Sequence, residues 1–248
     1  MVTTAEDGAP RAIAVLGAAL VVAGAHIGPA ATWLPGVRGA LSPGLDGRGD
    51  SDRVALTFDD GPDPRSTPHF LRALDELRVG ATFFVLGSRL AKCPDLGRRI
   101  VAEGHELAVH GWHHERPWCP RPLRDATELA ATAALVTEIS GTRPLWYRPA
   151  YGILTGGRWA AARATGLRPV LWTAWGRDWK ASATPESVRA EVMKTLRGGA
   201  TVLLHDSDVV SAAGSWRSAL GALPGVVAEC RARGLAVGRL DEHGVRRR

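Results

Sequence analysis

Residues 54–64 read VALTFDDGPDP, an apolar and partly β-branched run that ends in two adjacent aspartates and a Gly-Pro pair. The run predicts a buried strand, because β-branched and aromatic side chains favour extended backbone. Asp-Asp-Gly-Pro is also favourable turn chemistry, so Asp59 and Asp60 could serve a turn alone. A buried strand would then end in two charges without a partner, which is costly. We therefore expect the pair to belong to a functional site.

Short β-type runs alternate with helical patterns along the rest of the chain. We predict seven strands, at residues 53–58, 81–86, 106–109, 145–147, 169–172, 200–204 and 235–238. Helices with apolar positions near a 3.6-residue period are predicted between them, at 67–79, 122–141, 186–199 and 215–234. This alternation favours a parallel α/β sheet that is closed or nearly closed into a barrel.

Composition sets wider limits on the fold and the partners. The 248 residues, 45% of them hydrophobic, suffice for one large domain. A net charge of +6 permits anionic partners. The sequence has no nucleic-acid-binding motif, however, and we expect the protein not to bind nucleic acid. The three cysteines, Cys93, Cys119 and Cys230, lack metal or redox spacing, which leaves one disulfide or three free thiols open.

The N-terminal part is apolar and suggests a membrane-related segment. Residues 12–25 carry no charge, and the uncharged stretch continues to Val37 with only His26 inside it. We expect residues 1–34 to be an export or anchor segment, with membrane anchoring through 12–34, although a buried core helix is the alternative. The Gly- and Pro-rich residues 35–52 read as a linker, 53–240 as the catalytic domain and 241–248 as a basic tail.

Polar motifs follow several of the predicted strands. HGWHH (110–114), YRPAYG (147–152), GRDW (176–179) and HD (205–206) come after the third to sixth strands. The carboxyl ends of parallel strands meet at one face, so these motifs should converge with Asp59 and Asp60.

The residue types at this face suggest hydrolysis assisted by a metal ion. His110 and His114 have a spacing that suits a divalent cation when a carboxylate completes the set, although packed or loop histidines are the alternative. One aspartate of the pair could bind the metal while the other accepts a proton from water, with Arg148 keeping that base ionised. His205 could act as an acid tuned by Asp178, or be an ordinary core histidine.

Together these motifs resemble those of the polysaccharide deacetylases, the NodB-homology or carbohydrate esterase family 4 enzymes. TFDDGP (57–62) is similar to the first family motif almost letter for letter, and GHELAVHGWHH, RPAYG, DW and LLHD resemble the other four. The likeness covers about residues 53–240 and implies a distorted (β/α)7 barrel. Gly111, Val109 and Ala150 depart from the family pattern, and the acid often found near Thr173 is missing, but no catalytic group is removed.

The resemblance implies a role for each site residue. Asp59 would be the general base, and Asp60, His110 and His114 would bind the metal. Arg148 would orient Asp59, and Asp178 would tune His205, the general acid. The backbone N–H of Tyr151 would stabilise the oxyanion, while Trp179 and Leu203 would line a pocket for the acetyl methyl group.

We therefore expect a metal-dependent hydrolase that removes N-acetyl groups from amino sugars of a polysaccharide, peptidoglycan or chitin-like, outside the cytoplasmic membrane. Zinc is the favoured metal, with cobalt, manganese or nickel also suited to the ligands. An O-acetyl esterase and an inactive glycan-binding barrel are the alternatives.

Overall fold

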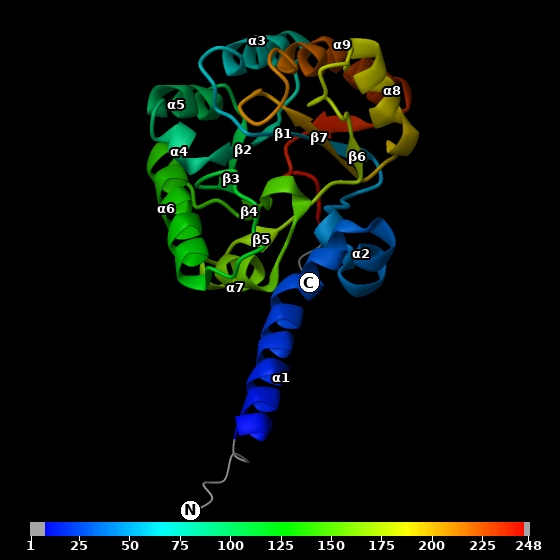
Figure 1. The fold of residues 1–248 in the computed structure, drawn as a ribbon. Coiled ribbons are helices and arrows are strands. Elements are labelled where there is room, and N and C mark those ends of the chain that lie inside the picture. Colours follow the sequence, from blue (N-terminus) through cyan, green and yellow to red (C-terminus); the bar gives the residue numbers. More distant parts are fainter. Residues whose placement is uncertain (1–7, 246–248) are drawn as a thin grey trace, which may run out of the picture.

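The computed structural model describes residues 8–245, and Arg246–Arg248 of the predicted tail lie outside that range. All strand pairs of the sheet are parallel, in the order β5-β4-β3-β2-β1-β7-β6, and β8 pairs with β1 (Figure 1). The strands are β1 (Arg53–Asp59), β2 (Thr82–Leu86), β3 (Glu106–Gly111), β4 (Trp146–Tyr147), β5 (Arg168–Pro169), β6 (Ala174–Trp175), β7 (Ala200–His205) and β8 (Ala236–Gly238).

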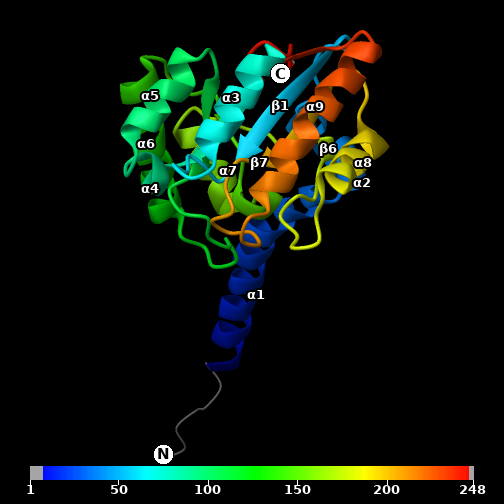
Figure 2. The same cartoon turned by 90° about the horizontal axis from the view of Figure 1, so that it is seen from above.

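Helices cover the outside of the curled sheet (Figures 1 and 2). They are α3 (Thr67–Leu77), α4 (Gly87–Leu90), α5 (Pro94–Ala102), α6 (Pro122–Ser140), α7 (Gly156–Ala164), α8 (Pro185–Thr195) and α9 (Trp216–Ala232). The main core lies between β1, β2, β7 and helices α3, α8 and α9. There Phe58 of β1 packs edge-on against Phe70 of α3, with ring centroids 5.1 Å apart. Aromatic contacts of this kind add stability beyond the area they bury.

The predicted distorted barrel is confirmed, with one difference among its strands. Each of the seven predicted strands overlaps an observed one, although the fifth is shorter than expected and begins at Arg168. The sequence reading missed β6, which pairs with β7 through Ala174 and Trp175. It also missed helices α5 and α7. Two paired residues are too few for a periodic pattern, so β6 depends on its neighbour β7 for definition.

The N-terminal part consists of α1 (Gly8–Ile27), the 3-10 helix η1 (Gly28–Trp33), α2 (Pro35–Leu41) and the 3-10 helix η2 (Pro43–Asp46). Helix α1 leaves the domain on the side toward which the β1 arrow points (Figure 2). The stretch Ala14–Trp33 is long and apolar enough to cross a membrane, and almost all of it is exposed.

Residues 35–52, which the sequence reading took as a linker, pack against the domain in their central part. Leu45 is buried, and its carbonyl accepts a hydrogen bond from Leu171 N at 2.6 Å. Thr201 Oγ1 donates to the carbonyl of Gly47 at 2.8 Å. Residues 45–47 therefore contact both the segment after β5, through Leu171, and strand β7, through Thr201. Their Gly and Pro content indicates tight turns against the sheet, for which Gly47 has a φ of +71°.

The cysteines are unpaired. Cys93 is partly buried, Cys119 is exposed and Cys230 is buried, and none of the three forms a disulfide within the part of the chain that the structure describes. Of the two alternatives that the sequence left open, the structure has three free thiols.

Candidate active site

The site begins where β1 ends, at the two aspartates. Asp59 is the last residue of β1, and its β-ladder partners are Phe84 of β2 and His205 of β7. Asp60 has a φ of +78°, a left-handed conformation that ends the strand and turns its side chain away from that of Asp59. Gly61 follows with no room for a side chain, because a Cβ there would lie 2.3 Å from a carboxylate oxygen of Asp206. The turn thus gives two adjacent carboxylates different surroundings.

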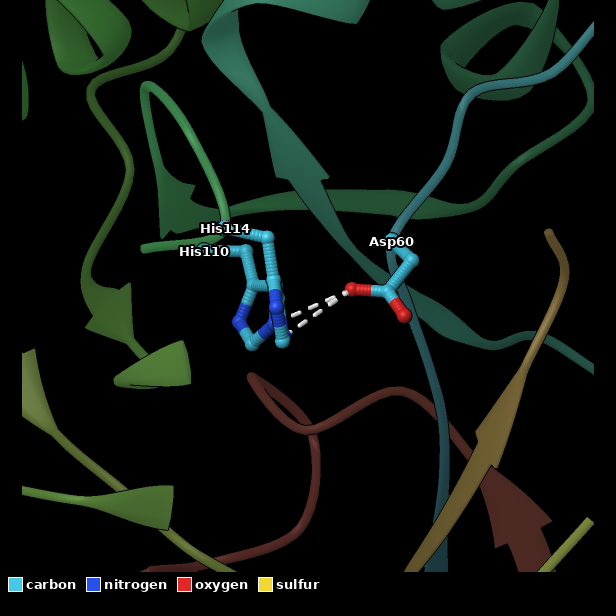
Figure 3. A group of neighbouring side chains, drawn as sticks. All are labelled: Asp60, His110 and His114. Carbon is cyan, nitrogen blue, oxygen red and sulfur yellow. Dashed lines mark ion pairs between the residues drawn. The ribbon is translucent and has the colours of Figure 1, made fainter. Parts of the chain in front are cut away.

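Asp60, His110 and His114 converge into one cluster, in which one ligand atom from each residue lies within 4.8 Å of the others (Figure 3). Asp60 Oδ1 lies 3.3 Å from His110 Nε2 and 3.5 Å from His114 Nε2. Both carboxylate oxygens of Asp60 are buried and accept no hydrogen bond from the described chain. A buried carboxylate without a donor, faced by two imidazole nitrogens, fits a divalent cation such as zinc.

The protonation states of this cluster suit metal binding. Burial alone would raise the pKa of Asp60, but the imidazoles of His110, His205 and His114 outweigh it and lower that pKa to about 2. Burial lowers the pKa of His114 to about 4. At neutral pH the carboxylate is therefore ionised and the His114 imidazole is neutral, which are the forms that bind a metal.

A β-bulge aims His110 at the cluster. Val85 of β2 pairs with Val109 and Leu86 pairs with Gly111, so His110 is the extra residue on β3. Its Nδ1 lies 2.8 Å from the Arg148 carbonyl oxygen, which leaves Nε2 facing Asp60. The next residue is Gly111, where the family usually has Ser or Thr. Its φ is +124°, a value that glycine adopts readily and residues with a side chain rarely adopt.

Arg148 is fully buried and holds Asp59. Its Nη1 donates to Asp59 Oδ1 at 2.7 Å and to Thr57 Oγ1 at 2.8 Å, and its Nη2 donates to the Leu171 carbonyl at 3.0 Å. The guanidinium also lies 4.0 Å from the centroid of the Phe84 ring. Burial lowers the pKa of Arg148 from its ordinary value, yet arginine stays charged in proteins. A buried charge with this many partners fixes the position of the Asp59 carboxylate.

The partly buried His205 and the buried Asp178 form a second pair, beside the other carboxylate oxygen of Asp60. The His205 Nδ1 lies 3.0 Å from Asp178 Oδ1, and the backbone N–H of His205 donates to Asp178 Oδ2 at 2.7 Å. Burial lowers the pKa of His205, but the Asp178 carboxylate outweighs this effect and raises it to about 10. The His205 Nε2 lies 4.0 Å from Asp60 Oδ2. The site therefore places a protonated imidazole beside the cluster.

The other predicted residues also lie at the cluster. Tyr151 has a φ of +59°, an uncommon conformation for a residue with a side chain, and its ring contacts His114 edge-on at 4.3 Å between centroids. Trp179 contacts His205 in the same way at 5.9 Å, and Leu203 of β7 is buried beside them. All three line one cleft with the titratable groups.

This cleft has a volume of about 560 Å³. Three tryptophans form one wall, with Trp172 stacked on Trp175 at 5.7 Å and Trp175 against Trp179 at 5.1 Å. The rim also holds three residues that sequence reasoning missed: Ala30, Trp33 and Leu34. Trp33 lies beside Trp172, since a Cβ at Gly152 would be within 3.4 Å of both rings. The only signal in the sequence is Trp33 itself, an aromatic residue at the end of the apolar N-terminal stretch.

Some conspicuous residues lie outside the cluster. His113 is exposed in the loop after β3, as expected for a loop residue, and His69 stacks on Trp216 of α9 at 5.4 Å. Trp146 of β4 is buried in the core and does not line the cleft. Asp206 accepts a hydrogen bond from Thr67 Oγ1 at 2.5 Å and supports the turn at Gly61.

Comparison with known proteins agrees with this arrangement. The family model described as polysaccharide deacetylase matches residues 46–170. A chitooligosaccharide deacetylase of Bradyrhizobium sp. (strain ANU 289) is 42% identical over 155 residues, 62% of this chain and 70% of the relative. The solved structure of the Bc1960 peptidoglycan N-acetylglucosamine deacetylase superposes with a TM-score of 0.71 at 26% identity, over 79% of this chain and 91% of the other.

A third relative is a family 4 acetyl xylan esterase from Clostridium thermocellum, solved with a cobalt ion. It has a TM-score of 0.68 at 30% identity and covers 76% of this chain and 88% of its own. The matched model spans half of the sequence, and it includes the two aspartates, both cluster histidines and Arg148. On this evidence the chain belongs to the polysaccharide deacetylase family.

Proposed function

We propose that this protein is a metal-dependent hydrolase that removes N-acetyl groups from amino sugars of an envelope glycan, peptidoglycan or chitin-like. The observation that carries the proposal is that two separate ion pairs, Asp59 with Arg148 and His205 with Asp178, each lie within about 4 Å of the Asp60 cluster. One pair supplies a fixed carboxylate and the other a charged imidazole. Amide hydrolysis needs both a base and an acid.

Asp60, His110 and His114 would hold the metal ion, zinc first and cobalt, manganese or nickel as alternatives. Bound there, a divalent cation supplies Lewis-acid chemistry that polarises the acetyl carbonyl and makes a nearby water more acidic. Asp59 is then placed to receive the proton of the attacking water, because Arg148 occupies one carboxylate oxygen and leaves the other toward the cluster. Its Oδ2 lies 3.9 Å from His110 Nε2.

His205 would donate a proton to the departing amine. Its Nδ1 is held by Asp178, so that Nε2 faces the cluster. The backbone N–H of Tyr151 would stabilise the negative charge that forms on the carbonyl oxygen. Trp179 and Leu203 would enclose the acetyl methyl group, and the tryptophan wall would stack on neighbouring sugar rings.

The names of the relatives support this choice of substrate. One relative is a chitooligosaccharide deacetylase, and another is a peptidoglycan N-acetylglucosamine deacetylase. The solved acetyl xylan esterase favours a second candidate, removal of O-acetyl groups, with the same residues acting on a weaker bond. The exposed apolar helix α1 supports an anchored protein at the cell envelope.

Acetate release tests the proposal. Protein stripped of metal is reloaded with zinc or cobalt and incubated with N-acetylglucosamine oligomers, peptidoglycan and O-acetylated xylan. We expect release from the N-acetyl substrates to return with metal, and Asp59→Asn to lower it at least about 100-fold because it removes the base. His113→Asn, which changes an exposed imidazole one residue from the cluster, is the matched control and should retain activity. Release from O-acetyl substrates alone would replace the deacetylase with the esterase.

A further inference from the structure

The last turn of helix α1 packs against the catalytic domain. His26 is buried, and its Nε2 lies 2.9 Å from the Pro117 carbonyl oxygen in the loop after β3. The carbonyl of Ala25 packs so closely on Gly156, the first residue of α7, that a Cβ there would lie 2.3 Å from it. Arg38 Nη2 then donates to the Trp172 carbonyl at 3.1 Å. The domain is therefore held at a fixed place relative to the end of α1.

The free part of the apolar helix is shorter than a bilayer. Between Arg11 and the buried His26 lie 14 uncharged residues, 12–25, which span about 21 Å at 1.5 Å per residue. The hydrocarbon core of a bilayer is about 30 Å thick, which leaves a shortfall of roughly 9 Å. The candidate span accordingly reaches Trp33, which lines the cleft. A bilayer crossed by this segment must reach the domain face from which α1 leaves.

That face exposes large apolar side chains around the cleft mouth. Two lie at the end of η1 and line the cleft, and the others follow the carboxyl end of β3, β4 or β7, so all belong to the face of the active site. They are Trp33 (46% exposed), Leu34 (51%), Trp118 (47%), Leu123 (84%), Tyr151 (40%), Trp159 (37%), Val209 (40%) and Val210 (42%). Tryptophan and tyrosine are enriched where proteins meet the headgroup region of a membrane.

Loops at the same face also present positive charge. Arg116, in the loop after β3, is exposed with its guanidinium 5.0 Å from the Tyr151 ring centroid, and Lys180 is exposed after Trp179. Basic side chains beside an apolar surface suit anionic lipid headgroups.

From these observations we propose that the cleft-bearing face docks on the membrane surface and that the substrate is an N-acetylated glycan carried on a membrane lipid. The substrate class rests on the proposed deacetylase function, whereas the docking rests on α1 and the apolar face alone. A cleft that opens into the headgroup region can bind only the first few sugar units of a glycan chain that is attached to a lipid. Polymer strands farther from the membrane lie out of its reach.

The experiment uses the full chain, loaded with zinc and reconstituted into vesicles of phosphatidylcholine and phosphatidylglycerol. The substrates are one N-acetylglucosamine oligomer in three forms: free in solution, joined to a lipid by a short spacer, and joined by a long flexible spacer. We expect acetate release from the short-spacer form to be at least about 10-fold faster than from the free oligomer at equal bulk concentration, and to fall as the spacer lengthens. Equal rates for the three forms, or a faster rate with the long spacer, overturn the proposal.

Two variants separate docking from catalysis. Leu123→Ser combined with Trp159→Ser alters side chains that do not line the cleft. We expect unchanged release from the free oligomer and at least about threefold slower release from the short-spacer form. Lys194→Ser, in the last turn of α8, changes an exposed side chain far from this face and should alter neither rate. Slower release from both substrates with the double variant would count against docking.

A second measurement is independent of activity. Lipids brominated near the headgroup end of the acyl chain quench tryptophans that lie at the interface, so Trp159→Phe should lower the quenched fraction of the fluorescence. No change in that fraction contradicts the docking. If no acetate is released from any substrate, the deacetylase proposal fails, and the quenching result still decides whether this face meets the bilayer.

Discussion

Replacing Asp178 by asparagine should move the alkaline limit of activity toward neutral pH. The Asp178 carboxylate outweighs the effect of burial and raises the pKa of His205 to about 10, against an ordinary value of 6.5. If His205 acts as the acid, activity is present below its pKa and lost above it. Asparagine keeps the size of the side chain but removes the charge, so the pKa should fall toward 6.5, because only the Asp60 and Asp59 carboxylates then oppose the effect of burial.

The size of the effect follows from that difference. A change from about 10 to 6.5 corresponds to about 5 kcal/mol of lost interaction with the charged imidazole. At pH 8 the protonated fraction of His205 would fall from nearly all to about 3%, so kcat/KM should drop about 30-fold. A cation bound at Asp60 lowers the His205 pKa in both the wild type and Asp178→Asn. The quantity to compare is therefore the difference in the alkaline limit between the two proteins.

The assay is kcat/KM for acetate release by metal-loaded enzyme between pH 5 and 10. Asp208→Asn is the matched control, since Asp208 is a nearby carboxylate that pairs with Arg65 at 3.0 Å and not with His205. A fall in kcat/KM that is equal at every pH would indicate a purely structural role for Asp178. An alkaline limit that moves by less than about one pH unit would refute the assignment of His205 as the acid.

Three further predictions concern metal binding, stability and local packing. Asp60→Asn should weaken zinc binding at least about 100-fold by calorimetry, because it removes the only negative ligand of the cluster; unchanged affinity would place the metal elsewhere. Burial raises the pKa of Glu106 from 4.5 to about 7, so the free energy of unfolding should fall by at most about 3 kcal/mol as pH rises from about 4.5 to about 7. Urea titrations should show this slope in the wild type and not in Glu106→Gln. Gly61→Ala should cost about 1–3 kcal/mol in the same titrations, since its Cβ would meet the Asp206 carboxylate, and wild-type stability would contradict the close contact.

The strand ends that carry the site could be predicted because their signals are local. The run before Asp59 is apolar and β-branched, and the observed β1 ends at Asp59. Parallel topology then brings His205 beside Asp59 although the two residues are far apart in sequence. The bulge that aims His110 has no such signal, because it depends on how β3 pairs with β2.

Long-range packing of the N-terminal part could not be predicted. The contacts of His26 with Pro117 and of Leu45 with Leu171 join segments that no periodic pattern relates. Glycine and proline content alone suggested a linker where the chain in fact turns tightly against the sheet. For the same reason nothing in the sequence indicated that Trp33 lines the cleft.

The cleft rim formed by Ala30, Trp33 and Leu34 has a practical consequence for how the enzyme is produced. A soluble fragment that starts after residue 34 lacks the whole rim, and one cut after Ala25 loses the helix that holds His26 in place. Either truncation would leave the proposed metal ligands and the proposed acid and base residues in the chain, while the cleft would lose one part of its lining. Substrate preferences measured on such fragments would describe a wider cleft than the one in the full chain, so the length of the expressed chain becomes an experimental variable in its own right.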